Sequence, residues 1–122
     1  MAKTILVVDD SASLRQVVSL TLKRAGYEVM EAGDGREALG KLDGVRVNLI
    51  VSDVNMPNMD GIAMVQEIRK DPKNRFTPII MLTTESQDAV KQKGKEAGVK
   101  AWMVKPFKPD QMLNAVSKLV AP

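Results

Sequence analysis

The sequence predicts an α/β protein of the doubly wound class, in which helices cover both faces of one parallel β-sheet. Five short apolar runs alternate with five stretches whose apolar residues recur at helical spacing. Parallel strands need crossover connections, which helices supply, so this alternation favours a parallel sheet. No linker, repeat or low-complexity segment interrupts the 122 residues, so we expect a single domain over residues 1–122.

The first two strands flank a long helix. Thr4 to Val8 is a continuous apolar run, as expected of a strand that is buried on both faces. Ser11 or Ser13 is expected to cap the helix that follows, and Gly26 is typical of the position just beyond a helix end. The expected apolar stripe of this helix is Leu14, Val17, Val18, Leu20 and Leu22. Tyr27 to Met30 is predicted to form the second strand.

The middle of the chain carries the second helix, the third strand and the third helix. Asp34-Gly35 is expected to be a turn before a short helix that begins near Glu37 and ends near Gly44, with Ala38, Leu39 and Leu42 along it. The apolar run Val47 to Val51 predicts the third strand, which leads into Asp53. The third helix follows from Ile62, Val65 and Ile68, after Asp60 as a cap.

The last part of the chain repeats the pattern twice. Pro78 to Leu82 is a fourth apolar strand, and a weakly apolar helix over Ala89 to Ala97, closed by Gly98, should be the least stable of the set. The fifth strand is expected over Lys100 to Val104. The last helix begins near Pro109, with the stripe Met112, Leu113, Val116, Leu119 and Val120.

Polar residues follow four of the five strands. We expect the flavodoxin-like strand order 2-1-3-4-5, which makes the third strand central. Asp53 then lies between the Asp9-Asp10 pair and Thr83 at the carboxyl end of the sheet, where such folds bind ligands. Lys105 starts about 10 Å away, two strand spacings, and its long side chain reaches back toward Asp53.

Composition limits the chemistry of this crevice. The chain has no cysteine and no histidine, so thiol catalysis is excluded and any metal must be held by oxygen. Neighbouring carboxylates repel one another, and a hard cation such as Mg²⁺, Ca²⁺ or Mn²⁺ relieves that repulsion. A carboxylate is also a possible acceptor for a phosphoryl group.

Other classes of binding are disfavoured. The net charge of +3 is spread over helical stretches, and one Trp, one Tyr and two Phe offer no stacking platform for nucleic acid. No apolar run is long enough to cross a membrane and no signal sequence is evident, so we expect a cytoplasmic protein.

Val8-Asp9-Asp10, Ser52-Asp53 through Asp60-Gly61, Leu82-Thr83 and Val104-Lys105-Pro106-Phe107 resemble, in order and spacing, the receiver domain of two-component response regulators. The resemblance covers the whole chain and is greatest to the stand-alone, CheY-like chemotaxis type, without an output domain. It implies a signalling protein that is phosphorylated by a histidine kinase and has no enzymatic activity beyond its own phosphorylation and dephosphorylation.

The resemblance also implies a role for each site residue. Asp53 would be the phosphoacceptor. Mg²⁺ would be held by Asp10, Asp53 and the backbone carbonyl of Asn55, with Asp9 acting through water. The phosphoryl group would contact Thr83 and Lys105. Trp102 stands where the family usually has a Tyr or Phe switch residue, and Thr84 where a small residue is usual.

The same resemblance indicates where partners bind. The expected partner surface is the face of the fourth helix, fifth strand and last helix, with Lys91, Lys95, Lys100 and Trp102. Expected partners are a CheA-like histidine kinase and a downstream protein such as a flagellar motor switch component, and the chain is expected to be a monomer. Trp102 is equally compatible with a core or rim aromatic, and the lysines with a solvated face.

Four alternatives remain at this point. A flavodoxin-type electron carrier would need a glycine-rich phosphate loop where this chain has Asp9-Asp10. A phosphohydrolase with an aspartate nucleophile would need a second acid two residues later, where this chain has Asn55. A degenerate receiver is disfavoured because all five functional positions are filled. A phosphorelay intermediate or phosphate sink would have the same site as a motor ligand.

Overall fold

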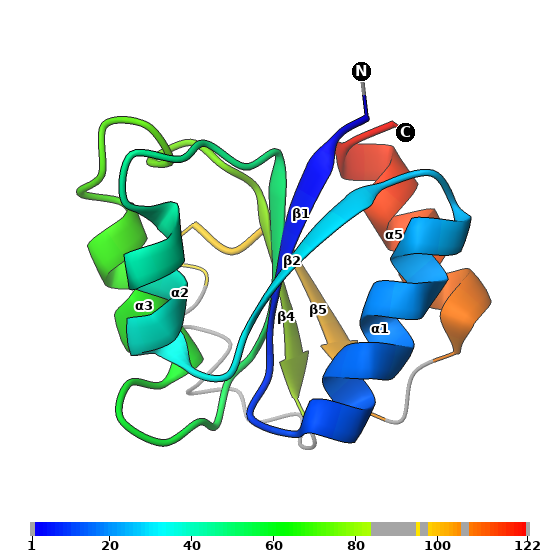
Figure 1. The fold of residues 1–122 in the computed structure, drawn as a ribbon, viewed down its shortest axis with the longest axis horizontal. Coiled ribbons are helices and arrows are strands. Elements are labelled where there is room, and N and C mark those ends of the chain that lie inside the picture. The colour runs from blue at the N-terminus through cyan, green and yellow to red at the C-terminus, as the bar shows by residue number, and fades with distance from the viewer. Residues whose placement is uncertain (1, 84–94, 96–97, 106–107, 122) are drawn as a thin grey trace.

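The computed structural model describes residues 2–83, 95, 98–105 and 108–121, and these form one parallel β-sheet between two layers of helices (Figure 1). The strand order is β2-β1-β3-β4-β5, so the predicted fold class and topology are confirmed. The strands are β1 (Thr4–Val8), β2 (Glu28–Ala32), β3 (Leu49–Asp53), β4 (Ile79–Thr83) and β5 (Ala101–Val104).

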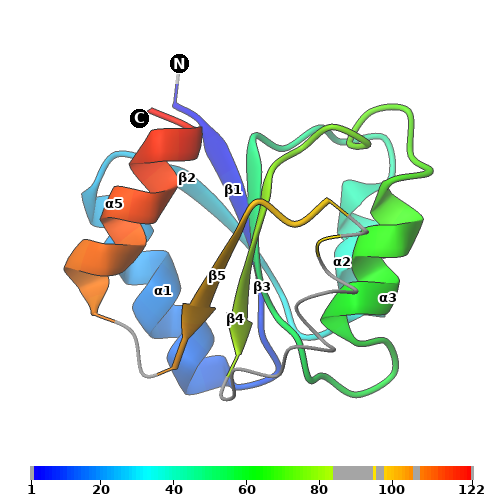
Figure 2. The same cartoon turned by 180° about the vertical axis from the view of Figure 1, so that it is seen from behind.

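The described helices divide between the two faces of the sheet. Helices α1 (Ala12–Arg24) and α5 (Pro109–Leu119) cover one face, and α2 (Gly35–Leu42) and α3 (Gly61–Ile68) cover the other (Figures 1 and 2). The helix predicted over Ala89 to Ala97 lies outside the described residues except for Lys95. No helix in the described part of the chain combines the length and apolar character needed to span a bilayer.

Side chains that accept hydrogen bonds from the backbone cap three of the helices. The Ser11 Oγ accepts from the N–H of Leu14, and the Asp60 Oδ1 accepts from the N–H of Ala63. The Asp34 Oδ1 accepts from the N–H of Glu37 at 2.9 Å, so Asp34 is the N-cap of α2 rather than only a turn residue. Helix α2 therefore begins at Gly35, two residues earlier than predicted.

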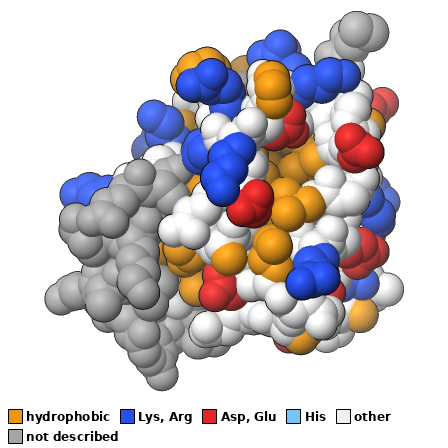
Figure 3. Space-filling view, turned by 90° about the vertical axis from the view of Figure 1, so that its left-hand side faces the viewer, with side chains coloured by type: hydrophobic (Ala, Val, Ile, Leu, Met, Phe, Trp, Pro, Cys, Tyr) orange, Lys and Arg blue, Asp and Glu red, His pale blue; other side chains and the backbone are white. Residues whose placement is uncertain are grey.

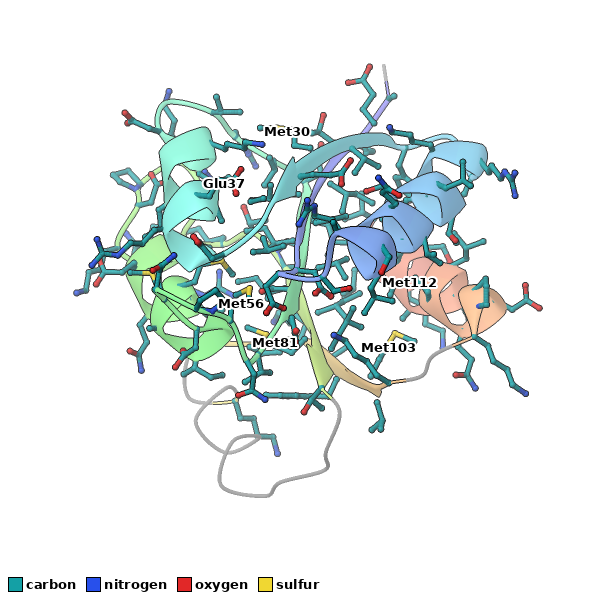
Figure 4. All side chains as sticks on the ribbon, turned by 60° about the horizontal axis from the view of Figure 1, so that its bottom comes forward. Met30, Glu37, Met56, Met81, Met103 and Met112 are labelled. Carbon is teal, nitrogen blue, oxygen red and sulfur yellow. The ribbon has the colours of Figure 1, made fainter. Side chains whose placement is uncertain are left out.

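The core consists of two apolar clusters, one on each side of the sheet. Successive strand residues point to opposite faces, so Leu6 and Val8 pack toward α2 and α3, whereas Ile5 and Val7 pack toward α1 and α5. Viewed from the carboxyl end of the strands, Met81 lies on the α3 side and Met112 on the α5 side (Figure 4). Burial on both faces explains why β1, β3 and β4 are built mainly from continuous apolar runs, whereas the edge strand β2 carries two glutamates and is only partly buried.

All four strands after β1 begin one or two residues later than the apolar pattern predicts, and hydrogen bonds account for this at β3 and β2. The N–H of Val47 donates to the side chain of Asn74 at 3.1 Å, so Val47 is buried without joining the sheet. Strand β3 therefore runs from Leu49 and ends at Asp53. The N–H of Tyr27 donates to the carbonyl of Leu22 at the end of α1, and β2 begins one residue later, at Glu28.

The outer face of α1 is more apolar than its pattern suggests. Val18 and Leu22 are buried, as predicted, but Val17 and Leu20 are about half exposed because they project away from the sheet. On the side of α2 and α3, basic side chains gather toward the end that carries both termini, and acidic side chains lie between them (Figure 3).

Candidate functional site

The carboxyl ends of β1, β3, β4 and β5 meet at one edge of the sheet, and each brings a polar residue there. Asp9 and Asp10 follow β1, Asp53 ends β3, Thr83 ends β4 and Lys105 follows β5. Register keeps these ends level, since Asp53 pairs with Leu82 on β4 and Thr83 pairs with Val104 on β5. Figure 4 shows this end of the molecule, with Met56 and Met81 on its α3 side and Met103 on its α5 side.

Three carboxylates converge at this edge and form what we call the acid cluster: Asp9, Asp10 and Asp53. One carboxylate oxygen from each lies within 4.8 Å of the other two. Asp9 and Asp53 are only 1% and 7% exposed, whereas Asp10 is exposed to solvent. Two charges are therefore largely removed from water, which makes their mutual repulsion stronger than at an open surface.

Lys105 supplies the opposite charge. Its Nζ lies 3.2 Å from Oδ2 of Asp9 and 3.1 Å from Oδ2 of Asp53, and its side chain is 14% exposed. The N–H of Lys105 donates to the carbonyl of Thr83 at 2.7 Å, which ties the start of the loop to the end of β4. The predicted reach of this lysine across two strands is thus present in the structure.

Backbone donors hold the remaining oxygens of the two buried carboxylates. Oδ1 of Asp9 accepts from the N–H of Ser11 at 2.9 Å, and Oδ1 of Asp53 accepts from the N–H of Val54 at 2.8 Å. Both carboxylates are therefore fixed in orientation. Within the described part of the chain, the Asp10 carboxylate has no hydrogen-bond or ion-pair partner, so its oxygens are available to a ligand.

The electrostatic balance at Asp53 is unfavourable for its charged form. Burial raises the pKa of the Asp53 carboxyl above its ordinary value, and the nearby charge of Asp9 raises it further. The hydrogen bond and charge of Lys105 lower the pKa, but burial prevails. One ammonium therefore does not fully compensate the acid cluster, and an additional cation would be stabilising.

The donor set fits a hard divalent cation. Among the residues that the structure describes, the possible metal ligands that converge here are carboxylate oxygens, and such oxygen ligands suit Mg²⁺ or Ca²⁺. Mg²⁺ usually takes one or two carboxylates and keeps several waters, which agrees with one exposed and two buried acids. Asn55, whose backbone carbonyl is the further predicted ligand, is an exposed residue two positions beyond Asp53.

The loop after β3 folds back closely on Asp53, which the sequence did not indicate. A Cβ placed on Gly61 would lie 2.4 Å from the backbone oxygen of Asp53, so only glycine permits this approach. The N–H of Gly61 donates to the carbonyl of Val54 at 2.8 Å. In the same loop Asn58 adopts a φ of 65°, and its side chain donates to Asp34 at 2.8 Å.

Some of the residues predicted to switch conformation or to bind a partner lie in the described part of the structure, and others do not. Thr83 is 5% exposed at the end of β4. Trp102 is partly buried and packs against the apolar cluster on the side of α2 and α3, as a core or rim aromatic would. Lys95 and Lys100 are exposed, whereas Lys91 and Thr84 lie outside the described residues.

Comparisons with known proteins agree on one family. The family described as the response regulator receiver domain matches residues 5–117. The chain is 44% identical over 107 residues to the chemotaxis protein CheY1 of Helicobacter pylori, covering 86% of each chain. The structure of the chemotaxis protein CheY4 of Vibrio cholerae matches with a TM-score of 0.94 and 48% identity, covering 98% of this chain and 100% of that one.

A solved structure with lower sequence identity to this chain contains a metal ion. The receiver domain of the sensor histidine kinase PA1611 of Pseudomonas aeruginosa matches with a TM-score of 0.90 and 27% identity, covering all of both chains. That structure is described as having a magnesium ion coordinated in its active-site cleft.

Proposed function

This chain belongs to the response regulator receiver family, and we propose that it accepts a phosphoryl group on Asp53 from a histidine kinase in a Mg²⁺-dependent reaction. The observation that carries the proposal is the state of Asp53 itself. This carboxylate is buried, fixed in orientation by Val54 and Lys105, and placed within 4.8 Å of two further acids. Such a group is a positioned nucleophile next to a site for a neutralising cation.

For the proposed phosphoryl transfer, the protein needs mainly to position Asp53 and to neutralise the charge of the phosphoryl group. An oxygen of Asp53 would form a bond to phosphorus while the bond from phosphorus to the donor's leaving nitrogen breaks, and that nitrogen keeps the electron pair. The product is an acyl phosphate. Lys105 already lies 3.1 Å from Asp53, so its ammonium is placed to offset the charge that the phosphoryl group adds.

Asp10, Asp53 and the backbone carbonyl of Asn55 are the proposed direct ligands of Mg²⁺, and Asp9 would act through water. When bound, the ion supplies charge neutralisation and orients the phosphoryl oxygens. Asp10 is exposed and its carboxylate has no partner among the described residues, whereas Asp9 is buried and paired with Lys105, which supports this division of roles. The magnesium ion described for the Pseudomonas aeruginosa receiver domain supports the choice of metal.

The proposed response passes through Thr83 and Lys105. Both stand at strand ends beside Asp53, and a shift of either one is transmitted to β4, β5 and the segment after Thr83. The face of the predicted fourth helix, β5 and α5, with Trp102, Lys91, Lys95 and Lys100, would then change its affinity for a partner. Exposed Lys95 and Lys100 favour an acidic or amphipathic helical target.

The relatives named as chemotaxis proteins support a role in chemotaxis or motility. The proposed partners are a CheA-like kinase and a downstream target such as a flagellar motor switch component. A phosphorelay intermediate or phosphate sink would share the same site, and partner capture with and without beryllofluoride separates these roles. A motor ligand gains affinity for its target with the mimic, whereas a sink or relay protein has no such target.

Labelling with acetyl phosphate tests the core of the proposal. Wild type with Mg²⁺ should gain one acid-stable, base-labile phosphoryl group, and chelation of the metal should abolish labelling. Asp53→Asn should not be labelled. Asp60→Asn is the matched control, because it removes a carboxylate seven positions along the chain from Asp53, while asparagine can still cap α3. Full labelling of Asp53→Asn would show that the phosphoacceptor is another residue.

A further inference from the structure

We propose that Arg15 is a positioning residue for the acid cluster, which it serves by fixing the peptide between Asp9 and Asp10. Arg15 lies in the first turns of α1, and no pattern in the sequence assigns it a role. The inference rests on the proposed function, since it concerns how this chain prepares its magnesium site.

The guanidinium of Arg15 joins three parts of the fold. One terminal nitrogen, Nη1, donates to the backbone carbonyl of Asp9 at 2.6 Å, and Nε donates to Oε1 of Glu31 at 3.1 Å. Glu31 lies near the end of β2. Arg15 is 22% exposed, so these contacts are partly shielded from water. A planar guanidinium with several fixed donors suits two acceptors at once.

The contact with Asp9 fixes a peptide plane that matters for the ligands. The N–H of Asp9 donates to the carbonyl of Ala32 at 3.1 Å, so Asp9 is held through its N–H by β2 and through its C=O by Arg15. Because a peptide unit is planar, fixing this C=O also fixes the N–H and Cα direction of Asp10. Asp10 has no side-chain partner in the described structure, so the backbone is what aims its carboxylate.

Geometry rather than charge is the main effect that we infer. The ion pair with Glu31 offsets the positive charge of Arg15 next to the cluster. A lysine at this position would keep the charge. It would lack the planar guanidinium, whose separate N–H donors bind Asp9 and Glu31 at the same time. If the charge of Arg15 were responsible, Arg15→Lys would bind Mg²⁺ as wild type does. If the geometry of the guanidinium is responsible, Arg15→Lys should bind Mg²⁺ more weakly than wild type.

The experiment measures the Kd for Mg²⁺ by calorimetry at constant ionic strength, well below the melting temperature of each variant. Arg15→Ala should raise the Kd about tenfold, the lower end of the loss seen when groups that orient metal ligands are removed. Arg15→Lys should recover only part of the affinity. Arg24→Ala is the matched control on the same helix and should bind as wild type does. The amide NMR shift of Asp10 should move in Arg15→Ala and remain unchanged in Arg24→Ala.

The outcomes separate this inference from the proposed function. A wild-type protein that binds no Mg²⁺ overturns the proposed site and this inference with it. Normal binding by wild type, with a Kd for folded Arg15→Ala within twofold of it, overturns the role of Arg15 alone. Wild-type affinity for Mg²⁺ in Arg15→Lys also overturns the positioning role, because the charge and not the guanidinium geometry would then be responsible. If Arg15→Ala fails to fold, Arg15→Lys decides: a raised Kd for Mg²⁺ together with a moved Asp10 amide shift supports the role of Arg15, and wild-type values for both overturn it.

Discussion

Lys105 bridges two buried carboxylates that come from different strands: its Nζ lies 3.1 Å from Oδ2 of Asp53 and 3.2 Å from Oδ2 of Asp9. The ammonium starts after β5, two strands away from β3 and three from β1. A cation in this position stabilises the cluster and also competes with any metal for the same oxygens. The contact therefore links the stability of the protein, its affinity for metal and its response to phosphorylation.

Replacing this lysine should separate those effects. Lys105→Met removes the competing charge, so the affinity for Mg²⁺ should rise several-fold, as expected when a like charge leaves a partly buried site. Stability without metal should fall, because two carboxylates lose their counter-charge. Titration calorimetry and thermal melts measure both quantities.

Lys100→Met is the control for this change, because that lysine is exposed and lies outside the cluster. Labelling of Asp53 by acetyl phosphate should persist in part in Lys105→Met, while the conformational response should be reduced. An unchanged affinity for Mg²⁺ would argue that the ammonium does not compete with the metal.

The charge of Asp53 should cost stability at neutral pH. Burial raises the pKa of this carboxyl in the folded state above its value in the unfolded chain. The folded protein therefore binds the proton more tightly, and the cost is absent below the unfolded pKa and grows as pH rises through the folded pKa. Asp53→Asn should then increase the free energy of unfolding in chelator at pH 7.

The stabilisation by Asp53→Asn should shrink toward acid pH, where the wild-type carboxyl is protonated. Denaturant unfolding at pH 7 and at acid pH tests this, with Asp60→Asn as the control. A variant that is less stable than wild type at pH 7 would mean that the contact with Lys105 outweighs the cost of burial.

Gly61 should be indispensable for both stability and labelling. The Cβ of alanine would lie 2.4 Å from the carbonyl oxygen of Asp53, so the start of α3 would have to move. Gly61→Ala should lose about 1–3 kcal/mol of stability, as overpacking usually does, and should be labelled more slowly by acetyl phosphate.

Gly40→Ala provides the matched control for this substitution. An added Cβ on Gly40 meets no atom within 4 Å, and the residue lies inside α2. It should therefore stabilise the protein by up to about 1 kcal/mol and leave labelling unchanged. Urea unfolding measures both variants, and equal effects at the two glycines would contradict the close approach to Asp53.

Trp102 should report the activated state. It is the one tryptophan of the sequence, and it lies on β5 opposite Met81, close in the sheet to Thr83. Its fluorescence should change when Mg²⁺ and beryllofluoride are added together. Thr83→Ala should reduce that change, and Thr83→Ser, which keeps the hydroxyl, should retain it. An equal change in wild type and Thr83→Ala would exclude the proposed route through Thr83.

Much of the fold could be predicted because its signals are local. Apolar runs such as Thr4 to Val8, and the helical spacing of Val18 and Leu22, reflect burial that each segment shows in its own sequence. The polar residues at the strand ends could be grouped once a strand order was chosen, since parallel strands bring their carboxyl ends to one edge. The structure brings Asp9, Asp10, Asp53 and Lys105 together there.

Element boundaries and packing partners depended on the tertiary structure. Val47 is as apolar as the strand that follows it, but its N–H donates to Asn74 and its carbonyl accepts from Thr77, so side chains distant in sequence take the place of a neighbouring strand. Val17 and Leu20 belong to the predicted apolar stripe of α1, yet both are about half exposed, whereas Val18 and Leu22 are buried. Periodicity identifies an apolar face but does not say where its edges lie.

The sequence by itself determined the class of fold, the chemistry available at the strand ends and the exclusion of thiol and imidazole groups. Only the tertiary structure decided how that chemistry is held: Arg15 on the carbonyl of Asp9, and Gly61 against the carbonyl of Asp53. Both contacts are made to backbone atoms, which are the same in every residue. A side chain that binds a backbone carbonyl therefore leaves no complementary residue type in the sequence, and only the folded geometry identifies its partner.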